Sequence, residues 1–293
     1  MPTSLRVRAA SVTLAVTDHG SGGPASPPLL FAHATGFCGA VWAPFVAAFR
    51  DHYRVITLDQ RGHGDSDKPK DAYAWRFFVE DLAAVIDALE LREVIAVGHS
   101  KGGAAVAGVA ADFPGRIARA VLIDPVLIAS RDESAPLPVQ NPLAEGARRR
   151  RMVWANRAQM KESYARRMPF RSWRDDVLDA YLEHGTFVRP DGQVELKCPG
   201  EIEARVYEGA MFSGSLGKLS RIDVPVLLIA GGESSTLPPE AARQAASRLR
   251  HGRLEILPGV GHFVPMEAPD RVIELIDDFV SEEPSARRRA VRG

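Results

Sequence analysis

The stretch VIAVGHSKGGAA, residues 94–105, decides the fold of this chain. It begins as an apolar run typical of a buried strand and continues after Ser100 as a small-residue run typical of a closely packed helix. Glycines stand two positions before and two positions after Ser100, in the pattern G-x-S-x-G. A sharp strand-to-helix turn of this kind exposes a serine hydroxyl as a nucleophile. The structural alternative is a glycine-rich turn with a helix-capping serine.

Strand and helix patterns alternate on both sides of this stretch. A hairpin is expected over 5–18, and further strands are expected at 29–34, 54–59, 94–98, 118–124, 224–231 and 253–259. Helices are expected at 39–50, 75–90, 104–113, 238–249 and 269–280. Such alternation implies right-handed crossovers. The sequence therefore predicts an α/β protein whose mostly parallel, eight-stranded sheet is flanked by helices.

The alternation stops between residues 130 and 217, where no clear strand pattern occurs and two stretches have helical character. We therefore expect a helical cap over 130–217, inserted into a core made of residues 1–129 and 218–282. The last residues, 283–293, have no apolar face, and we expect them to be disordered.

The composition excludes several classes of function. The 293 residues include 37 Lys and Arg and 37 Asp and Glu, so no net charge favours nucleic acid or an anionic membrane. No apolar stretch reaches the roughly 18 residues of a membrane span, and the N-terminus lacks the apolar core of a signal peptide. We expect a cytoplasmic protein in which Cys38 and Cys198 are free thiols. The oligomeric state stays open, with a homodimer among the options.

His262 is the expected general base. It lies in GVGHFVPMEAPD, residues 259–270, between the last expected strand and the last expected helix. A lone loop histidine is more often solvated than catalytic. A histidine at this place, however, gives the chain order of serine first and histidine last that suits this type of nucleophile.

The segment FAHATGF, residues 31–37, follows an apolar strand and could direct backbone N–H groups at a developing oxyanion. We expect the donors to be the backbone amides of Thr35 and Lys101. We interpret His33 as a structural brace of this loop, and we expect the side chain of Lys101 to point away from the pocket.

Four motifs together resemble the α/β-hydrolase fold superfamily, in the branch that carries a helical cap. They are HATGF with Trp42 nine residues after its histidine, LDQRGHGDSDKP (58–69), GHSKGG (98–103) and GVGHFVPMEAPD. The resemblance covers residues 25–280, although Ala34 replaces the glycine of the commoner H-G-x form. The layout is similar to haloalkane dehalogenases and epoxide hydrolases, which use a carboxylate as nucleophile. Ser100 in its place implies an acyl-enzyme intermediate.

The acid of the triad is displaced in this chain. In most of the family it stands three residues beyond a glycine, after the strand that follows the cap. Counting from Gly231, that position is Ser234, which cannot hold a charge. In some relatives, haloalkane dehalogenases among them, the acid follows the preceding strand, where Asp124 stands here. We favour Asp124, with Glu233 as the runner-up, because Asp124 needs no shift of backbone register. An Asp-Pro step that merely ends the strand is the structural alternative.

The expected cap is rich in large apolar side chains that could roof a pocket or pack the cap helices on one another. The candidates for the pocket are Trp154, Met160, Tyr164, Phe187 and, beside the histidine, Phe263. We interpret the run Arg148–Arg151 as a solvated face, with an anion site as the alternative.

These residues predict a serine hydrolase that cleaves small carboxylic esters, or lactones, through an acyl-enzyme and a Ser-His-Asp triad. We expect no cofactor and no metal, because neither a phosphate-binding loop nor metal-ligand spacing occurs. One alternative is a C–C bond hydrolase of diketone-type acids, which would need cations in its pocket. Another is a non-catalytic ligand-binding protein that keeps the fold.

Overall fold

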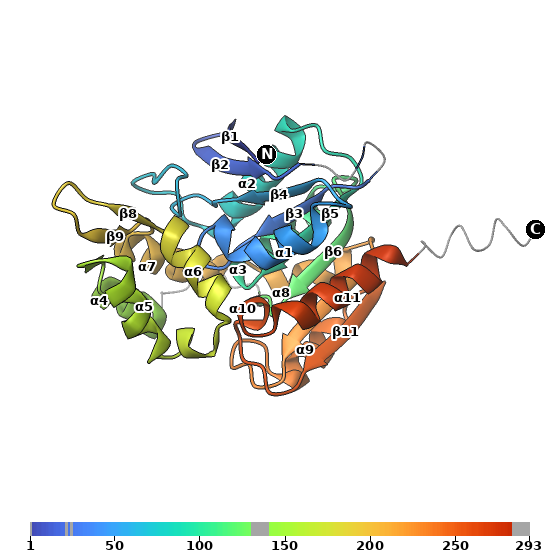
Figure 1. Cartoon of the computed structure of the whole chain (residues 1–293). Coiled ribbons are helices and arrows are strands. Elements are labelled where there is room, and N and C mark those ends of the chain that lie inside the picture. Colours follow the sequence, from blue (N-terminus) through green and yellow to red (C-terminus); the bar gives the residue numbers. More distant parts are fainter. Residues whose placement is uncertain (1, 21–22, 24–25, 130–140, 283–293) are drawn as a thin grey trace, which may run out of the picture.

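An eight-stranded sheet forms the centre of the protein (Figure 1). The computed structural model describes residues 2–20, 23, 26–129 and 141–282. The strands are β1 Thr3–Arg8, β2 Thr13–Asp18, β3 Leu29–Ala32, β4 Val55–Leu58, β5 Val94–His99, β6 Ile117–Ile123, β10 Val226–Gly231 and β11 Gly252–Leu257. Their order is β1-β2-β4-β3-β5-β6-β10-β11, and all neighbours from β4 to β11 are parallel. The predicted sheet is confirmed.

Helices cover both faces of this sheet, so its central strands are apolar throughout. Every residue of β3, β4, β5 and β10 is buried, as expected for parallel strands between two helical layers. One face carries α2 Trp75–Ala88, α3 Lys101–Asp112 and α9 Pro239–Ala246. The other carries η1 Gly39–Trp42, α1 Ala43–Phe49 and α11 Pro269–Ser281.

Between β6 and β10 the described chain forms a separate group of short elements, which we call the cap segment, residues 141–221 (Figure 1). Its helices are α4 Pro142–Arg149, α5 Arg157–Ala165, η2 Phe170–Ser172, α6 Asp175–His184, α7 Gly200–Gly209, η3 Ala210–Phe212, α8 Ser215–Lys218 and η4 Leu219–Arg221. The expectation of no strand is wrong. Strands β7 Val153–Trp154, β8 Thr186–Val188 and β9 Val194–Leu196 pair in an antiparallel sheet of order β7-β9-β8. Strands of two or three residues are too short to show a period of two.

Three further expectations concern the ends of the expected segments, membrane-spanning helices and the two cysteines. The tail 283–293 and the first part of the expected cap, 130–140, lie outside the described residues. Across the part of the chain that is described, no helix has both the length and the apolar character needed to cross a bilayer. Cys38 and Cys198 are buried free thiols, as expected.

The loop after β4 holds the loop after β3 in place. His33 accepts a hydrogen bond from the backbone N–H of Gln60 through Nε2 (3.0 Å) and donates through Nδ1 to the carbonyl of Ala34 (2.7 Å). His63 accepts through Nε2 from the N–H of Gly36 (3.0 Å). Each imidazole therefore binds in its neutral form, since a ring nitrogen that accepts a hydrogen bond carries no proton.

We predict that these buried neutral imidazoles make the protein sensitive to acid. Burial, together with the nearby charge of Lys101, lowers the pKa of His33 from 6.5 to about 3. Between these two pH values the unfolded chain binds a proton that the folded chain does not, so the free energy of unfolding falls as the pH falls. The slope for one such histidine is about 1.4 kcal/mol per pH unit.

Urea denaturation at several pH values tests this. His33→Gln should make the decline between pH 6 and pH 4 shallower, whereas His52→Gln, at an exposed position, should leave the slope unchanged. An equal slope in wild type and His33→Gln would contradict the assignment.

Candidate active site

Ser100 occupies a strained turn between β5 and α3. Its φ and ψ angles are 55° and −116°, a backbone conformation that residues other than glycine rarely adopt. A Cβ atom on Gly98 would collide with the carbonyl oxygen of Gly102, and one on Gly102 would collide with the carbonyl oxygen of Ala32. The G-x-S-x-G pattern is therefore a steric requirement of this turn.

The structure brings the three predicted triad residues together. The Nε2 atom of His262 accepts a hydrogen bond from the hydroxyl of Ser100 (3.0 Å), and its Nδ1–H donates to Oδ1 of Asp124 (2.7 Å). Asp124 directly follows β6, the neighbour of β5 in the sheet, and it too has a positive φ, 40°. This arrangement can take a proton from a serine hydroxyl and stabilise the imidazolium that results.

The buried carboxylate of Asp124 accepts hydrogen bonds from three groups. Besides His262, the hydroxyl of Ser234 donates to Oδ1 (2.7 Å) and the backbone N–H of Gly231 donates to Oδ2 (2.9 Å). Ser234, at the position where most of the family places the acid, therefore supplies a hydrogen bond to the displaced acid. Glu233 is exposed and has no hydrogen bond to His262. The geometry thus favours Asp124 over the runner-up.

The histidine loop is anchored on both sides of His262. Glu267, on α10 Val264–Glu267, accepts from the N–H of Gly261 (3.0 Å) and from the N–H of Phe263 (3.2 Å). His99 donates through Nε2 to the carbonyl of His262 (2.9 Å). Burial lowers the pKa of His99 well below 6.5, so this bond comes from a neutral ring. Glu267 is not predicted from the sequence, although its carboxylate lies only five residues after the histidine.

The two expected oxyanion donors have backbone amides that are free to bind. The N–H of Gly36 is already taken by His63, but within the described ranges neither Thr35 nor Lys101 donates its N–H to an acceptor. Lys101 is the first residue of α3, where the helix dipole also favours a negative charge. Both residues are buried.

An aromatic cluster lies beside the histidine. The ring of Phe263 has its centroid 5.0 Å from that of His262, and it also contacts Phe37 and Trp173 at 5.9 and 5.7 Å. Tyr164 stacks on Phe170 at 4.1 Å, and Phe170 in turn contacts Trp173. Phe263 and Tyr164 therefore belong to this cluster, as do Phe37, which was not among the candidates, and Tyr181.

Of the other pocket candidates, Trp154 also contacts the cluster, with its ring centroid 5.5 Å from that of Tyr164. Trp154 and Met160 are only 2% and 0% exposed and belong to the apolar core that the cap segment shares with α1 and α11. Phe187 is 42% exposed on β8. Its assignment to the pocket is corrected, because this ring faces solvent.

The arginine run divides into two kinds of environment. Arg148 pairs with Glu201 and Glu208 at the surface. Arg150 is largely buried, forms an ion pair with Glu203, and donates to the hydroxyl of Tyr181 (3.0 Å). That hydroxyl donates to the carbonyl of Gly36 (3.2 Å), which places the group against the loop that contains Thr35. The expectation of a solvated face is therefore wrong for Arg150.

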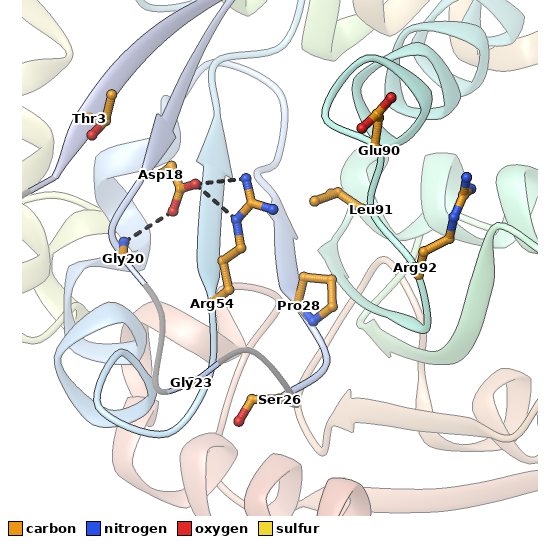
Figure 2. Close-up of a pocket in the computed structure, with 10 residues that line it drawn as sticks. All are labelled: Thr3, Asp18, Gly20, Gly23, Ser26, Pro28, Arg54, Glu90, Leu91 and Arg92. Atoms are coloured by element: carbon orange, nitrogen blue, oxygen red, sulfur yellow. Dashed lines mark hydrogen bonds and ion pairs between the residues drawn. The ribbon is translucent and has the colours of Figure 1, made fainter.

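A separate groove of about 490 Å³ lies at the opposite end of the sheet (Figure 2). Its lining includes Pro28 and Arg54, which precede β3 and β4, and Asp18, which pairs with Arg54. Because Ser100 and Asp124 follow the carboxyl ends of their strands, this groove is not part of the triad site.

Comparison with known proteins identifies the family of this chain. The model of the Alpha/beta hydrolase family matches residues 29–275. A non-heme chloroperoxidase of Streptomyces lividans is 32% identical over 80% of this chain and 84% of its own length. A 2-(acetamidomethylene)succinate hydrolase of Mesorhizobium japonicum is 29% identical over 94% of this chain and 95% of its own length.

Among solved structures, that of an E-2-(acetamidomethylene)succinate hydrolase superposes with a TM-score of 0.81 at 24% identity, covering 96% of this chain and 100% of the other. This likeness extends the agreement in fold to nearly the whole chain. The chain belongs to the alpha/beta hydrolase family.

Proposed function

We propose that this protein is a cytoplasmic serine hydrolase that cleaves small carboxylic esters or lactones. The observation that supports this most directly is the continuous relay from Ser100 through His262 to Asp124, with hydrogen bonds of 3.0 and 2.7 Å. A relay of this kind activates a serine for attack on an acyl carbon.

The proposed reaction has two halves. His262 takes the proton of Ser100 as the serine oxygen attacks the carbonyl, and the amides of Thr35 and Lys101 stabilise the negative oxygen. The protonated imidazole then gives its proton to the leaving alkoxide, and an acyl-enzyme remains. In the second half His262 removes a proton from water as the water attacks the acyl group, and it returns this proton to the Ser100 oxygen when the acid is released. Asp124 stabilises the imidazolium in both halves.

The alternatives receive less support from the site. A C–C bond hydrolase acting on diketone-type acids would need a cation for the substrate carboxylate. Arg150 lies against the loop that contains Thr35, which it reaches through the hydroxyl of Tyr181. Its positive charge is already neutralised by the ion pair with Glu203. A non-catalytic binding protein would not need an intact relay or a serine in a strained turn.

We predict that Ser100→Ala abolishes ester hydrolysis. The variant keeps His262 and Asp124 but has no oxygen to form the acyl-enzyme, so release of nitrophenol from p-nitrophenyl acetate and butyrate should fall to background. Ser247→Ala, at an exposed serine that directly follows α9, is the matched control and should retain the wild-type rate. Equal rates in wild type and Ser100→Ala would contradict the proposed function.

We also predict that the amide substitutions Asp124→Asn and Glu233→Gln have very different effects on kcat. Asp124→Asn should lower kcat by about 10⁴-fold, because the amide no longer favours the productive imidazole tautomer or the imidazolium. Glu233→Gln should change kcat by less than about twofold, since an exposed side chain without a bond to His262 contributes little. The same nitrophenyl assay measures both. A large loss in Glu233→Gln with a small loss in Asp124→Asn would reverse the assignment.

A further inference from the structure

Lys101 carries an ammonium group in a place where such a group is costly. It follows Ser100 directly as the first residue of α3, and its side chain is 0% exposed. Among the residues that the structure describes, Nζ has no hydrogen-bond partner and no ion pair. A buried cation without an anion is strongly disfavoured, whereas an apolar residue of the same length would fill the space without that penalty.

The surroundings of Nζ offer only weak compensation. It lies 3.9 Å from the centroid of the Phe78 ring on α2, a favourable but modest cation–π contact. Asp81, an acidic residue on the same helix as Phe78, already accepts hydrogen bonds from Nε and Nη2 of Arg61 at 2.6 and 2.7 Å.

Lys101 and Phe78 also line a cavity of about 40 Å³ between α2, α3 and α8, and no acidic side chain is among the described residues that line it. Lys218, on the same cavity, has its own partner in Asp112. No carboxylate of the described chain therefore forms an ion pair with Lys101, and the carboxylate of Asp81, which Arg61 already holds, favours its charge only through space.

We propose that the Lys101 ammonium supplies a positive potential that stabilises the oxyanion formed at the backbone amide of the same residue. The charge lies within the length of one lysine side chain from that N–H, in a buried interior where electrostatic interactions are stronger than in water. It is fixed in place before the reaction, and a full negative charge arises near it only when the carbonyl oxygen becomes an oxyanion, so that its potential can act even though the side chain points away from the reacting atoms. The effect therefore falls on kcat and leaves KM unchanged. This inference rests on the proposed function.

A catalytic effect of the Lys101 charge makes kcat depend on pH. Burial lowers the pKa of Lys101 well below 10.5, so its charge is lost as the pH rises through that lowered value, and kcat should fall with it. The other titrating groups near Nζ do not cause this decline of kcat at alkaline pH. The pKa values of His33 and His63 are lowered, so both rings are neutral at alkaline pH, and that of Cys198 is raised to about 12. Arg61 and Asp81 stay paired with each other.

The test uses the full chain and the nitrophenyl assay, with kcat and KM measured from pH 6 to pH 10. Lys101→Met keeps the backbone amide and the side-chain length but removes the charge. We expect kcat to fall by about ten- to thirtyfold, KM to stay constant, the alkaline decline to disappear, and Tm to rise because the buried charge is gone. Lys101→Arg, whose charge persists at high pH, should restore much of kcat and show no alkaline decline.

Lys218→Met removes a lysine from the same cavity and is the matched control, with kcat and its pH profile unchanged. Two outcomes would overturn the inference. In the first, Lys101→Met has the kcat and the pH profile of the wild type. In the second, Lys101→Met loses kcat but also has a lower Tm and an unaltered alkaline decline, which would show a structural role. A wild-type protein without turnover that depends on Ser100 would instead overturn the proposed function, and this inference with it.

Discussion

The buried carboxylate of Asp124 is the group on which the arrangement of the site depends. It accepts hydrogen bonds from the histidine loop, from the hydroxyl of Ser234 and from the backbone of Gly231, so it joins the ends of β6 and β10 to the segment that follows β11. With no solvent contact, an Asp124 that lacked these donors would be destabilised by the loss of its hydration. The same bonds that satisfy the carboxylate therefore orient His262 towards Ser100.

Several unfavourable features occur at this edge of the sheet. Ser100 and Asp124 have positive φ angles without being glycine, and Lys101 holds a buried ammonium group without a described anion. Each of these features lowers the stability of the fold. The long apolar strands on both sides of the site supply the burial that offsets them, and the polar loops after β3 and β4 fix one another through His33 and His63. Strain at a site held by a rigid scaffold is typical of residues selected for chemistry.

Much of the fold could be predicted from the sequence, because the strands of the sheet are apolar runs bounded by glycine, proline and charged residues. Asp124 could be inferred because Ser234 has no charge and a second strand ends in an acid. The contacts of the cap segment could not be inferred in the same way. Whether Phe187 faces solvent and whether Arg150 meets Glu203 depend on how short helices and two- or three-residue strands pack, and no periodic pattern encodes that packing.

The measurement that most directly tests the central claim is the site of covalent labelling by a fluorophosphonate, read by mass spectrometry of peptides. The account predicts a single phosphonyl adduct on Ser100, formed rapidly by the wild type and far more slowly by His262→Ala, because the serine is nucleophilic only when the imidazole accepts its proton. An unlabelled Ser100 in the folded wild type, or labelling at the same rate without the imidazole, would contradict the claim that this serine is an activated nucleophile.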